Sequence, residues 1–213
     1  MVDIKRILRK IKHEILSREG FYSFLSYIPV IKRGRVNELE RPVVVSLTSV
    51  PWRFDKLHAG LMSLLWQTVR PDKIVLWLSE YNQKGERIVD PDNLPENLRR
   101  MQRKGVEIKF AEDIRSYRKL IPSLECFPDA IIITVDDDTL CPVSWLENLL
   151  AAHEEQPKAV VCYRGTRIQI NQDGLAPYIQ WPEYTTRGEP SYLLFAQGCG
   201  GILYPPGALH PEV

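Results

Sequence analysis

Three consecutive aspartates, Asp136, Asp137 and Asp138, are the side chains of this sequence with the clearest capacity for chemistry. They directly follow residues 131–135, a short apolar run rich in β-branched side chains, which predicts a strand buried on both faces. Adjacent carboxylates repel one another, and the end of a buried strand is an unfavourable place for unpaired charge. A divalent cation removes both costs, because magnesium, manganese and calcium prefer hard oxygen ligands. We therefore predict metal or substrate binding at these aspartates.

A second interpretation is that the aspartates cap the next helix. Pro142 and the apolar positions within 145–150 have the pattern of a helix start with one buried face. Asp138 or Thr139 could be the N-cap of that helix. One cap needs only one acid, however, so three acids in a row favour the binding interpretation.

Alternating strand and helix patterns surround the aspartates. The expected strands are 43–48, 73–78, 106–110, 131–135 and 159–163, and the expected helices are 55–67, 94–101, 116–124 and 145–153. This alternation predicts an α/β fold with a mostly parallel central sheet flanked by helices. Ligands of such sheets bind outside the carboxyl ends of the strands, which is where the aspartates would lie.

Polar side chains also follow the other expected strands and helices. Thr48, Ser49 and Arg53 come after the first strand and could hold the base, ribose or phosphate of a nucleotide. Arg118 and Lys119 precede the aspartate-ended strand and are cationic donors suited to phosphate. Exposed Arg and Lys usually form only a solvated surface, so it is their position in loops beside the strands that favours a binding role.

A glycine segment, Gly198–Gly201, precedes a further apolar run. It matches neither common phosphate-loop pattern. Glycines that enter a strand permit a bulge or the close approach of a ligand, so Gly198, Gly200 and Gly201 are expected to shape an acceptor pocket or a plain turn. Trp181, within the turn-rich residues 171–190, is assigned to the same acceptor pocket.

The composition of the 213 residues is that of an ordinary globular protein, with 44% hydrophobic and 26% charged residues. This length suffices for one domain, with or without an appendage. The formal net charge of +1 does not indicate a nucleic-acid partner. Up to Arg41, ten basic residues stand against five acidic ones, so this segment carries +5 and the remainder −4. We expect residues 1–41 to be a basic attachment to a domain over 42–213.

The attachment has the pattern of a basic amphipathic helix. Isoleucine and leucine recur at helical spacing over residues 4–15, and an aromatic group follows at 21–28. Two interpretations remain open for residues 4–28: contact with an anionic membrane surface, and packing on the domain itself or on a partner subunit. Apolar runs are too short for a transmembrane span, and we expect no signal peptide.

The cysteines bear on the compartment. Cys126, Cys141, Cys162 and Cys199 are scattered and form no C-x-x-C pair, which argues against a zinc site. The first three lie in or beside apolar runs, as buried free thiols do. The expected setting is therefore reducing and cytoplasmic.

Four blocks of sequence together resemble glycosyltransferases of the GT-A fold, close to the bacterial family 2 group. They read V-V-V-S-L-T-S-V-P-W-R-F at 43–54, S-L-L-W-Q-T-V-R-P-D-K-I-V-L-W-L-S at 63–79, V-D-D-D-T-L-C-P-V-S-W-L at 135–146 and G-C-G-G-I-L-Y-P-P-G at 198–207. The second resembles the family's Q-T-x-x-P signature between a helix and a strand, and the third its D-x-D metal motif. The resemblance covers roughly Pro42 to the C-terminus.

This resemblance implies a GT-A-like, Rossmann-related sheet and transfer of a sugar from a nucleotide-diphosphate donor to a hydroxyl of a glycan or glycolipid. Asp138, with Asp136, would bind Mn²⁺ or Mg²⁺. The donor would also contact a set of residues spread over the sheet edge: Thr48, Ser49, Arg53, Ser79, Glu80, Lys119, Asp136 and Asp137. The implied setting is synthesis of cell-surface polysaccharide or lipopolysaccharide at the inner face of the cytoplasmic membrane.

One departure from the family keeps alternatives open. Inverting members place a carboxylate base beyond the aspartate motif, and none of Asp173, Glu183 and Glu189 matches such a motif. The chain ends shortly after P-P-G, so we expect it to be incomplete at its C-terminus and its catalytic base to be unidentified. A non-catalytic nucleotide-sugar-binding domain is the main alternative. A nucleotidyltransferase is less favoured, because residues 48–54 lack the glycines of its phosphate loop.

Overall fold

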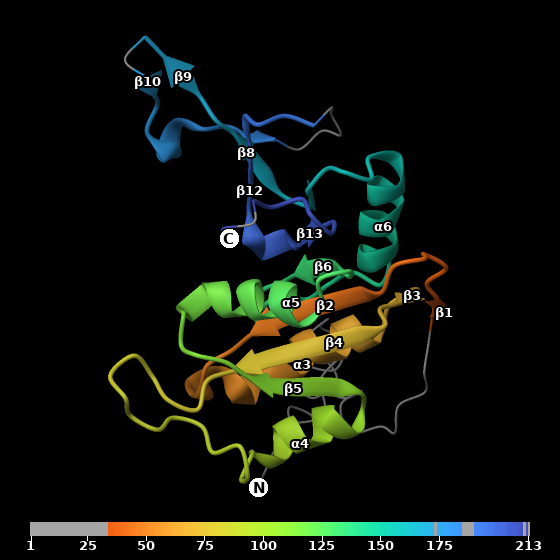
Figure 1. Ribbon diagram of the computed structural model, residues 1–213, viewed down its shortest axis with the longest axis vertical. Coiled ribbons are helices and arrows are strands. Elements are labelled where there is room, and N and C mark those ends of the chain that lie inside the picture. Colours follow the sequence, from red (N-terminus) through yellow and green to blue (C-terminus); the bar gives the residue numbers. More distant parts are fainter. Residues whose placement is uncertain (1–33, 173, 185–189, 211, 213) are drawn as a thin grey trace, which may run out of the picture.

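The computed structural model describes residues 34–172, 174–184, 190–210 and 212 (Figure 1). The helix expected within residues 4–28 lies outside this part of the chain. From residue 34 onward, a short strand β1 (Arg35–Val36) pairs in parallel with β3 (Val69–Arg70), so the described end of the N-terminal attachment lies beside the domain. Within the described residues, the helices are too short or too polar to span a bilayer.

A six-stranded sheet forms the centre of the fold. Its order is β5-β4-β2-β6-β13-β7. The strands are β2 (Val43–Thr48), β4 (Lys73–Leu78), β5 (Val106–Phe110), β6 (Ile131–Thr134), β7 (Val161–Cys162) and β13 (Ile202–Tyr204). The strands β2, β4, β5 and β6 run parallel to one another, and β13 is antiparallel to both β6 and β7. The predicted α/β architecture with a mostly parallel sheet is thus confirmed, and it is consistent with a GT-A-like fold.

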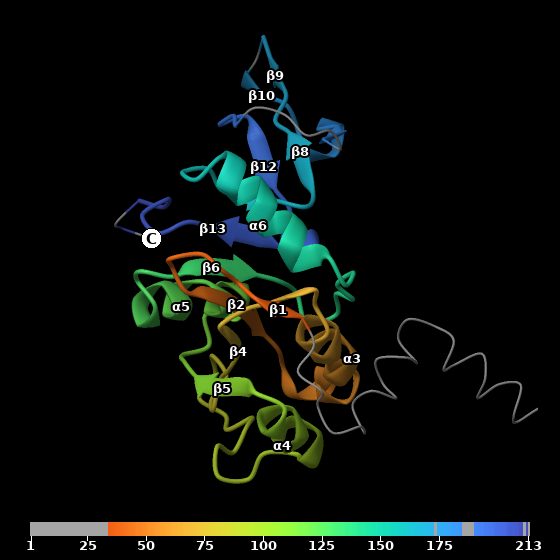
Figure 2. The same ribbon diagram turned by 90° about the vertical axis from the view of Figure 1, so that its right-hand side faces the viewer.

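Helices cover both faces of this sheet (Figure 2). One face carries α3 (Phe54–Leu65), α4 (Glu96–Arg103) and α6 (Trp145–Glu155), and the other carries α5 (Ile121–Cys126). Alternate residues of β2 point to opposite faces, with Val43 and Val45 in the larger core and Val44 in the smaller one. This double burial explains why the strands appear in the sequence as continuous apolar runs.

The helix expected over 116–124 is two elements. A 3₁₀ turn, η2 (Arg115–Lys119), is followed by α5, which begins at Ile121 with Pro122 in its first turn. Proline has no N–H to donate and favours the start of a helix, so the helix begins there instead of continuing from residue 116. The strand expected over 159–163 is also shorter, because only Val161 and Cys162 pair with β13.

The part of the chain that connects β7 to β13 projects away from the central sheet (Figure 1). It comprises residues 165–172, 174–184 and 190–196, and we call these residues the extension. Its strands are β8 (Gly165–Arg167), β9 (Ile170–Asn171), β10 (Gly174–Leu175), β11 (Glu183–Tyr184) and β12 (Leu194–Ala196), with a 3₁₀ turn η3 (Tyr178–Gln180). The strands β11-β8-β12 form an antiparallel sheet, and β9 pairs with β10. Part of the turn-rich stretch 171–190 is therefore short strand.

The cysteines only partly match the expectation of burial. Cys141 is buried and Cys162 is half-buried, but Cys126 is exposed, as is Cys199. Cys126 is the last residue of α5, where a helix end faces solvent, so the prediction was wrong for this thiol.

Candidate active site

The carboxyl ends of β2, β4, β5 and β6 meet at one edge of the sheet because these strands run parallel. The segments that leave this edge carry most of the predicted site residues. They are the loop after β2, the loops after β4 and β5, and residues 135–144 between β6 and α6, which we call the aspartate loop. The topology therefore gathers side chains that are far apart in the sequence.

Asp137 lies inside the protein, with 6% of its surface exposed. Ser49 Oγ donates a 2.6 Å hydrogen bond to one of its carboxylate oxygens, and Arg53 Nη1 lies 2.5 Å from the other. The second guanidinium nitrogen, Nη2, lies 2.8 Å from Asp138 Oδ2. Arg53 therefore bridges two consecutive aspartates, and its charge makes the buried carboxylate of Asp137 tolerable.

Asp136 forms its own ion pair, with the ammonium group of Lys119. The glycine segment lies against this pair, since a β-carbon added to Gly198 would be 3.4 Å from Lys119 Nζ and 3.8 Å from Asp136 Oδ2. Lys119 is also fixed through its backbone, because its carbonyl accepts a 2.5 Å hydrogen bond from Ser46 Oγ within β2. The structure thus brings together three residues with different predicted roles: Asp136 for metal binding, Lys119 for donor binding and Gly198 for the acceptor pocket.

Arg118 has a different position from the one expected. Its side chain is 2% exposed, and its guanidinium donates to Thr48 Oγ1 at 2.8 Å, to the Ser49 carbonyl at 3.1 Å and to Asp113 Oδ1 at 3.1 Å. Burial lowers the pKa of this guanidinium, and the nearby Asp113 carboxylate opposes that shift. The expectation of a phosphate contact is therefore corrected: Arg118 joins the loops that follow β2 and β5 from within the protein.

A groove of about 760 Å³ opens at the ends of β4 and β5. It is lined by residues 79–83 and 85 on one side and 110–114 on the other. Ser79 donates to the Ala111 carbonyl at 2.8 Å, and the Glu80 carboxylate lies 3.0 Å from Arg87 Nη2. Asp113 belongs to the lining as well, so Arg118 connects the groove to Thr48 and Ser49. A concave site of this size with several polar groups suits a small ligand.

The rest of the glycine segment packs on α6. The Trp145 indole N–H donates to the Gly200 carbonyl at 2.8 Å. Gly201 has φ = 95°, and a β-carbon there would lie 2.5 Å from Trp145 Cζ2. Gly200 similarly contacts Tyr163, where the corresponding distance to Cβ is 2.9 Å. Close backbone approach was predicted for these glycines, and at Gly200 and Gly201 the approaching groups are the protein's own side chains.

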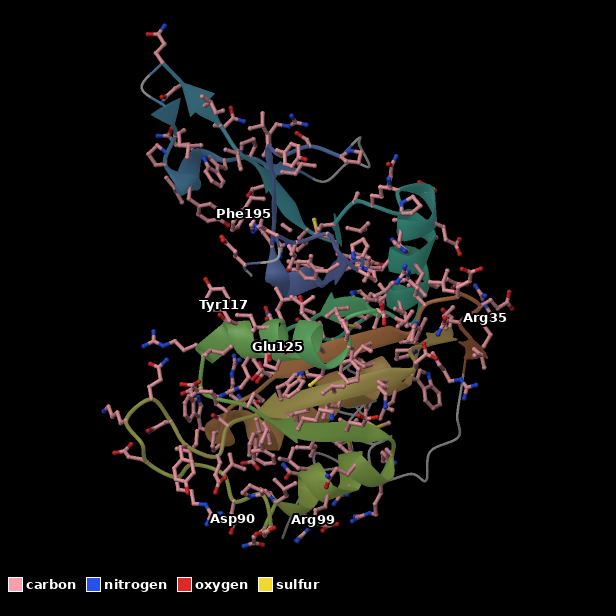
Figure 3. The ribbon with its side chains drawn as sticks, viewed as in Figure 1. Arg35, Asp90, Arg99, Tyr117, Glu125 and Phe195 are labelled. Atoms are coloured by element: carbon pink, nitrogen blue, oxygen red, sulfur yellow. The ribbon has the colours of Figure 1, made fainter. Side chains whose placement is uncertain are left out.

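Trp181 lies in the extension. Its ring contacts Tyr178 and Phe195 edge to face, with centroid distances of 5.3 and 5.9 Å. Figure 3 shows Phe195 on β12, within the extension. The Tyr178 hydroxyl accepts a 3.0 Å hydrogen bond from Gln197 Nε2, and Gln197 is the neighbour of Gly198. The predicted acceptor residues are thus linked, although Trp181 itself contacts the aromatic cluster and not the glycines.

The capping interpretation of the aspartates is wrong. Helix α6 begins at Trp145 with Ser144 at the N-cap position, so neither Asp138 nor Thr139 caps it. The Thr139 hydroxyl instead donates to the Cys199 carbonyl at 3.1 Å, which ties the aspartate loop to the glycine segment.

Sequence reasoning missed a residue that shapes this site. Gly60 lies within α3, and a β-carbon there would be 2.9 Å from the Asp137 carbonyl oxygen. The signal was present, because an isolated glycine inside a helical pattern usually has a packing reason.

The fit of a divalent cation can be judged from the carboxylates. Within the described residues, no three His, Cys, Asp or Glu side chains are placed to hold one metal ion together. The carboxylates of Asp136 and Asp138 are 37% and 65% exposed, whereas that of Asp137 is buried. Two accessible carboxylates fit a cation that takes its other ligands from water and substrate phosphates, as Mg²⁺ commonly does.

A search of curated proteins found no match. Among solved structures, a 4-diphosphocytidyl-2C-methyl-D-erythritol synthase is similar, with a TM-score of 0.43 and 13% sequence identity over 80% of this chain and 77% of that one. The family model described as glycosyl transferase family 2 matches residues 124–202, which include the aspartates and the whole glycine segment. This match confirms the family resemblance over residues 124–202.

Proposed function

We propose that this chain is a metal-dependent glycosyltransferase that moves a sugar from a nucleoside diphosphate to a hydroxyl acceptor. The observation that carries the proposal is the arrangement at the carboxyl edge of the sheet. There a groove of about 760 Å³ is connected through Arg118 to Thr48. Next to Thr48 in the loops at this edge are two ion pairs, Asp136 with Lys119 and Asp138 with Arg53. The family match over residues 124–202 spans the same aspartates.

The groove would take the nucleoside of the donor. Its lining offers carboxylates and backbone carbonyls as hydrogen-bond acceptors and the Phe110 region as an apolar wall. From there, the diphosphate would reach Lys119 and Arg53, whose ammonium and guanidinium groups are suited to phosphate oxygens. Arg53 is half exposed, so its guanidinium can meet a ligand while it still contacts Asp137.

Asp136 and Asp138 would hold Mn²⁺ or Mg²⁺. When bound, such an ion supplies positive charge against the developing negative charge of the leaving diphosphate. Asp137 has a supporting part in this proposal, because its carboxylate fixes the Ser49 hydroxyl and the Arg53 guanidinium. Lys119 would act on the same side as Asp136, by holding that carboxylate and by donating to the leaving group.

The acceptor would enter from the side of Gly198, which lies against Asp136 and Lys119. Without a side chain, this position leaves room for the acceptor's hydroxyl-bearing ring, and the extension with Trp181 would contact the rest of a glycan or glycolipid. We place the reaction in the synthesis of cell-surface polysaccharide or lipopolysaccharide at the inner face of the cytoplasmic membrane. Residues 4–28, with their basic amphipathic pattern, would provide the contact with the membrane surface.

Calorimetric titration of UDP and of GDP, with and without Mn²⁺, tests the proposal. We expect one of the two to bind in a metal-dependent way, and the Asp138→Ala variant to lose that binding. Asp129→Ala is the matched control, because this exposed aspartate precedes β6 at the opposite end of the strand. Unchanged metal and nucleotide binding in Asp138→Ala would contradict the assignment.

A non-catalytic nucleotide-sugar-binding domain is the second candidate. It is favoured by the existing ion pairs of Asp136 and Asp138 with Lys119 and Arg53, which already neutralise the carboxylates. Sugar transfer from the donor identified by calorimetry, measured with this chain and a mixture of glycan acceptors, would exclude this candidate. Donor hydrolysis alone would also indicate a competent leaving-group site.

A further inference from the structure

The Q-T motif after α3 has no part in the chemistry proposed above, yet its side chains reach across to the segment that carries the aspartates. Gln67 is 2% exposed and makes hydrogen bonds in two directions across this contact. Its Nε2 donates to the Pro142 carbonyl at 2.9 Å, and its Oε1 accepts from the backbone N–H of Leu146 at 3.0 Å. The side chain is thus bound to both the end of the aspartate loop and the start of α6.

Two neighbours of Gln67 extend the same contact. The buried Ser63, one turn earlier in α3, accepts a 3.0 Å hydrogen bond from the Cys141 N–H through its Oγ. After the helix, the backbone N–H of Thr68 donates to the Val143 carbonyl at 2.8 Å, and its hydroxyl donates to Glu147 Oε2 at 2.8 Å. Backbone groups of residues 141 to 143 are therefore bonded to Ser63 in α3 and to Gln67 and Thr68 just after this helix.

These bonds replace a missing helix cap. The first N–H groups of a helix have no partner within it and are commonly satisfied by the side chain of the N-cap residue. Ser144 holds that position in α6 but makes no capping bond with its side chain. Gln67 supplies the acceptor for Leu146 instead, so the start of α6 is capped by a side chain from the segment that follows α3.

We propose that Ser63 and Gln67 are positioning residues that fix the aspartate loop, and through it Asp136 and Asp138, for the donor and its cation. This inference rests on the proposed function for the identity of the ligand. The loop is held at its start by β6 and at its end by Gln67 and Ser63, with the aspartates between these two attachments. If the second attachment is released, the carboxylates lose their fixed spacing relative to Arg53 and Lys119.

Gln67→Met is the decisive variant, because methionine has a similar volume and an unbranched, flexible side chain but can make none of these hydrogen bonds. We expect the Kd of the nucleoside diphosphate in the presence of Mn²⁺ to rise by about 10- to 100-fold, the usual effect of losing a residue that orients a ligand group. In the ligand-free protein, the amides of Cys141 and Leu146 should also exchange with solvent faster.

Val106→Ala provides the control for a general loss of stability. Val106 is buried at the start of β5, which is separated from β6 in the sheet by the two strands β4 and β2. The comparison is made at a temperature where both variants are folded. A positioning role requires the Kd to rise in Gln67→Met and to stay near the wild-type value in Val106→Ala. A Kd that is equally unaffected, or equally raised, in both variants would overturn the proposal.

Ser63→Ala is the second variant, for use if Gln67→Met does not fold. Alanine is well tolerated in helices. The change removes the acceptor of the Cys141 amide, together with the 2.7 Å hydrogen bond that the Ser63 hydroxyl donates to the Gly60 carbonyl within α3. We expect faster exchange of that amide and a weaker Kd; wild-type values of both would refute the inference. If the wild-type chain binds neither UDP nor GDP, the proposed function fails. The exchange data from the ligand-free protein then still decide whether α3 fixes the loop.

Discussion

Gly60 of α3 lies against the backbone of Asp137, so closely that a β-carbon at position 60 would be 2.9 Å from the Asp137 carbonyl oxygen. The contact forces either the helix or the aspartate loop to move when any side chain is present. It therefore couples the position of α3 to that of the carboxylates at the sheet edge.

Gly60→Ala should destabilise the protein, although alanine is the better helix former by about 1 kcal/mol. Crowding in a packed interior costs about 1–3 kcal/mol, so we expect a net loss measurable by urea denaturation. Nucleotide affinity should fall as well, because the loop that moves carries Asp136 and Asp138. A gain in stability would show that α3 and the loop separate freely.

Arg53 is expected to stabilise the fold as well as to bind ligand. Arg53→Ala leaves the buried Asp137 carboxylate with the hydrogen bond from the Ser49 hydroxyl but without the charge of Arg53, an unfavourable state for a buried carboxylate. Because Arg53 is itself half exposed, solvent screening limits the loss to about 1–2 kcal/mol.

A double-mutant cycle separates this pair from general effects. Asp137→Asn combined with Arg53→Ala should cost less than the sum of the two single changes, as measured by denaturant unfolding. Strict additivity would mean that the 2.5 Å contact between Arg53 and Asp137 does not stabilise the folded state.

The central strands could be predicted from the sequence because packing on both faces requires long apolar runs. The strands expected at residues 43–48, 73–78 and 106–110 have the same bounds as β2, β4 and β5. The extension could not be predicted in this way. Its strands have two or three residues each. Of these, β9 and β10 are exposed, β8 is mostly buried and β12 is mostly half-buried, so neither strict alternation nor a continuous apolar run marks them.

The site was only partly accessible to sequence reasoning. Clustered carboxylates after a buried strand identified Asp136 and Asp138 as accessible groups at the sheet edge. The pairing of each acid with Arg53 or Lys119 depends on contacts between distant segments, which no local pattern encodes. Arg118 was misjudged for a related reason: arginine is rarely buried, and its burial here depends on partners in two other segments, Thr48 with Ser49 and Asp113.

Gly201 tests the packing of the glycine segment on α6. Gly201→Ala would introduce strain at φ = 95° and a contact of 2.5 Å with the Trp145 ring. Gly105→Ala is the matched control, because its φ is 103° but its β-carbon would meet nothing within 4 Å. Both changes should cost about 1–2 kcal/mol for the backbone, and Gly201→Ala should cost about 1–3 kcal/mol more for the clash. Equal losses of unfolding free energy would mean that the indole can move aside.

Cys141 reports on the state of the aspartate loop. Burial raises the pKa of its thiol to about 12, whereas Cys126 is exposed on α5. Since the thiolate is the reactive form, iodoacetamide at pH 8 should modify Cys126 in the folded protein and leave Cys141 unmodified, as read by peptide mass spectrometry.

The same burial links folding to pH. The folded-state pKa lies above the ordinary value of 9.0, so the unfolded chain loses this proton first as the pH rises. The contribution of Cys141 to stability is therefore complete below about pH 9 and declines between pH 9 and 12. In Cys141→Ala, that part of the decline in unfolding free energy should disappear. Rapid alkylation of Cys141 at pH 8 in the native protein would instead indicate that the loop opens, and that α3 does not hold it in place.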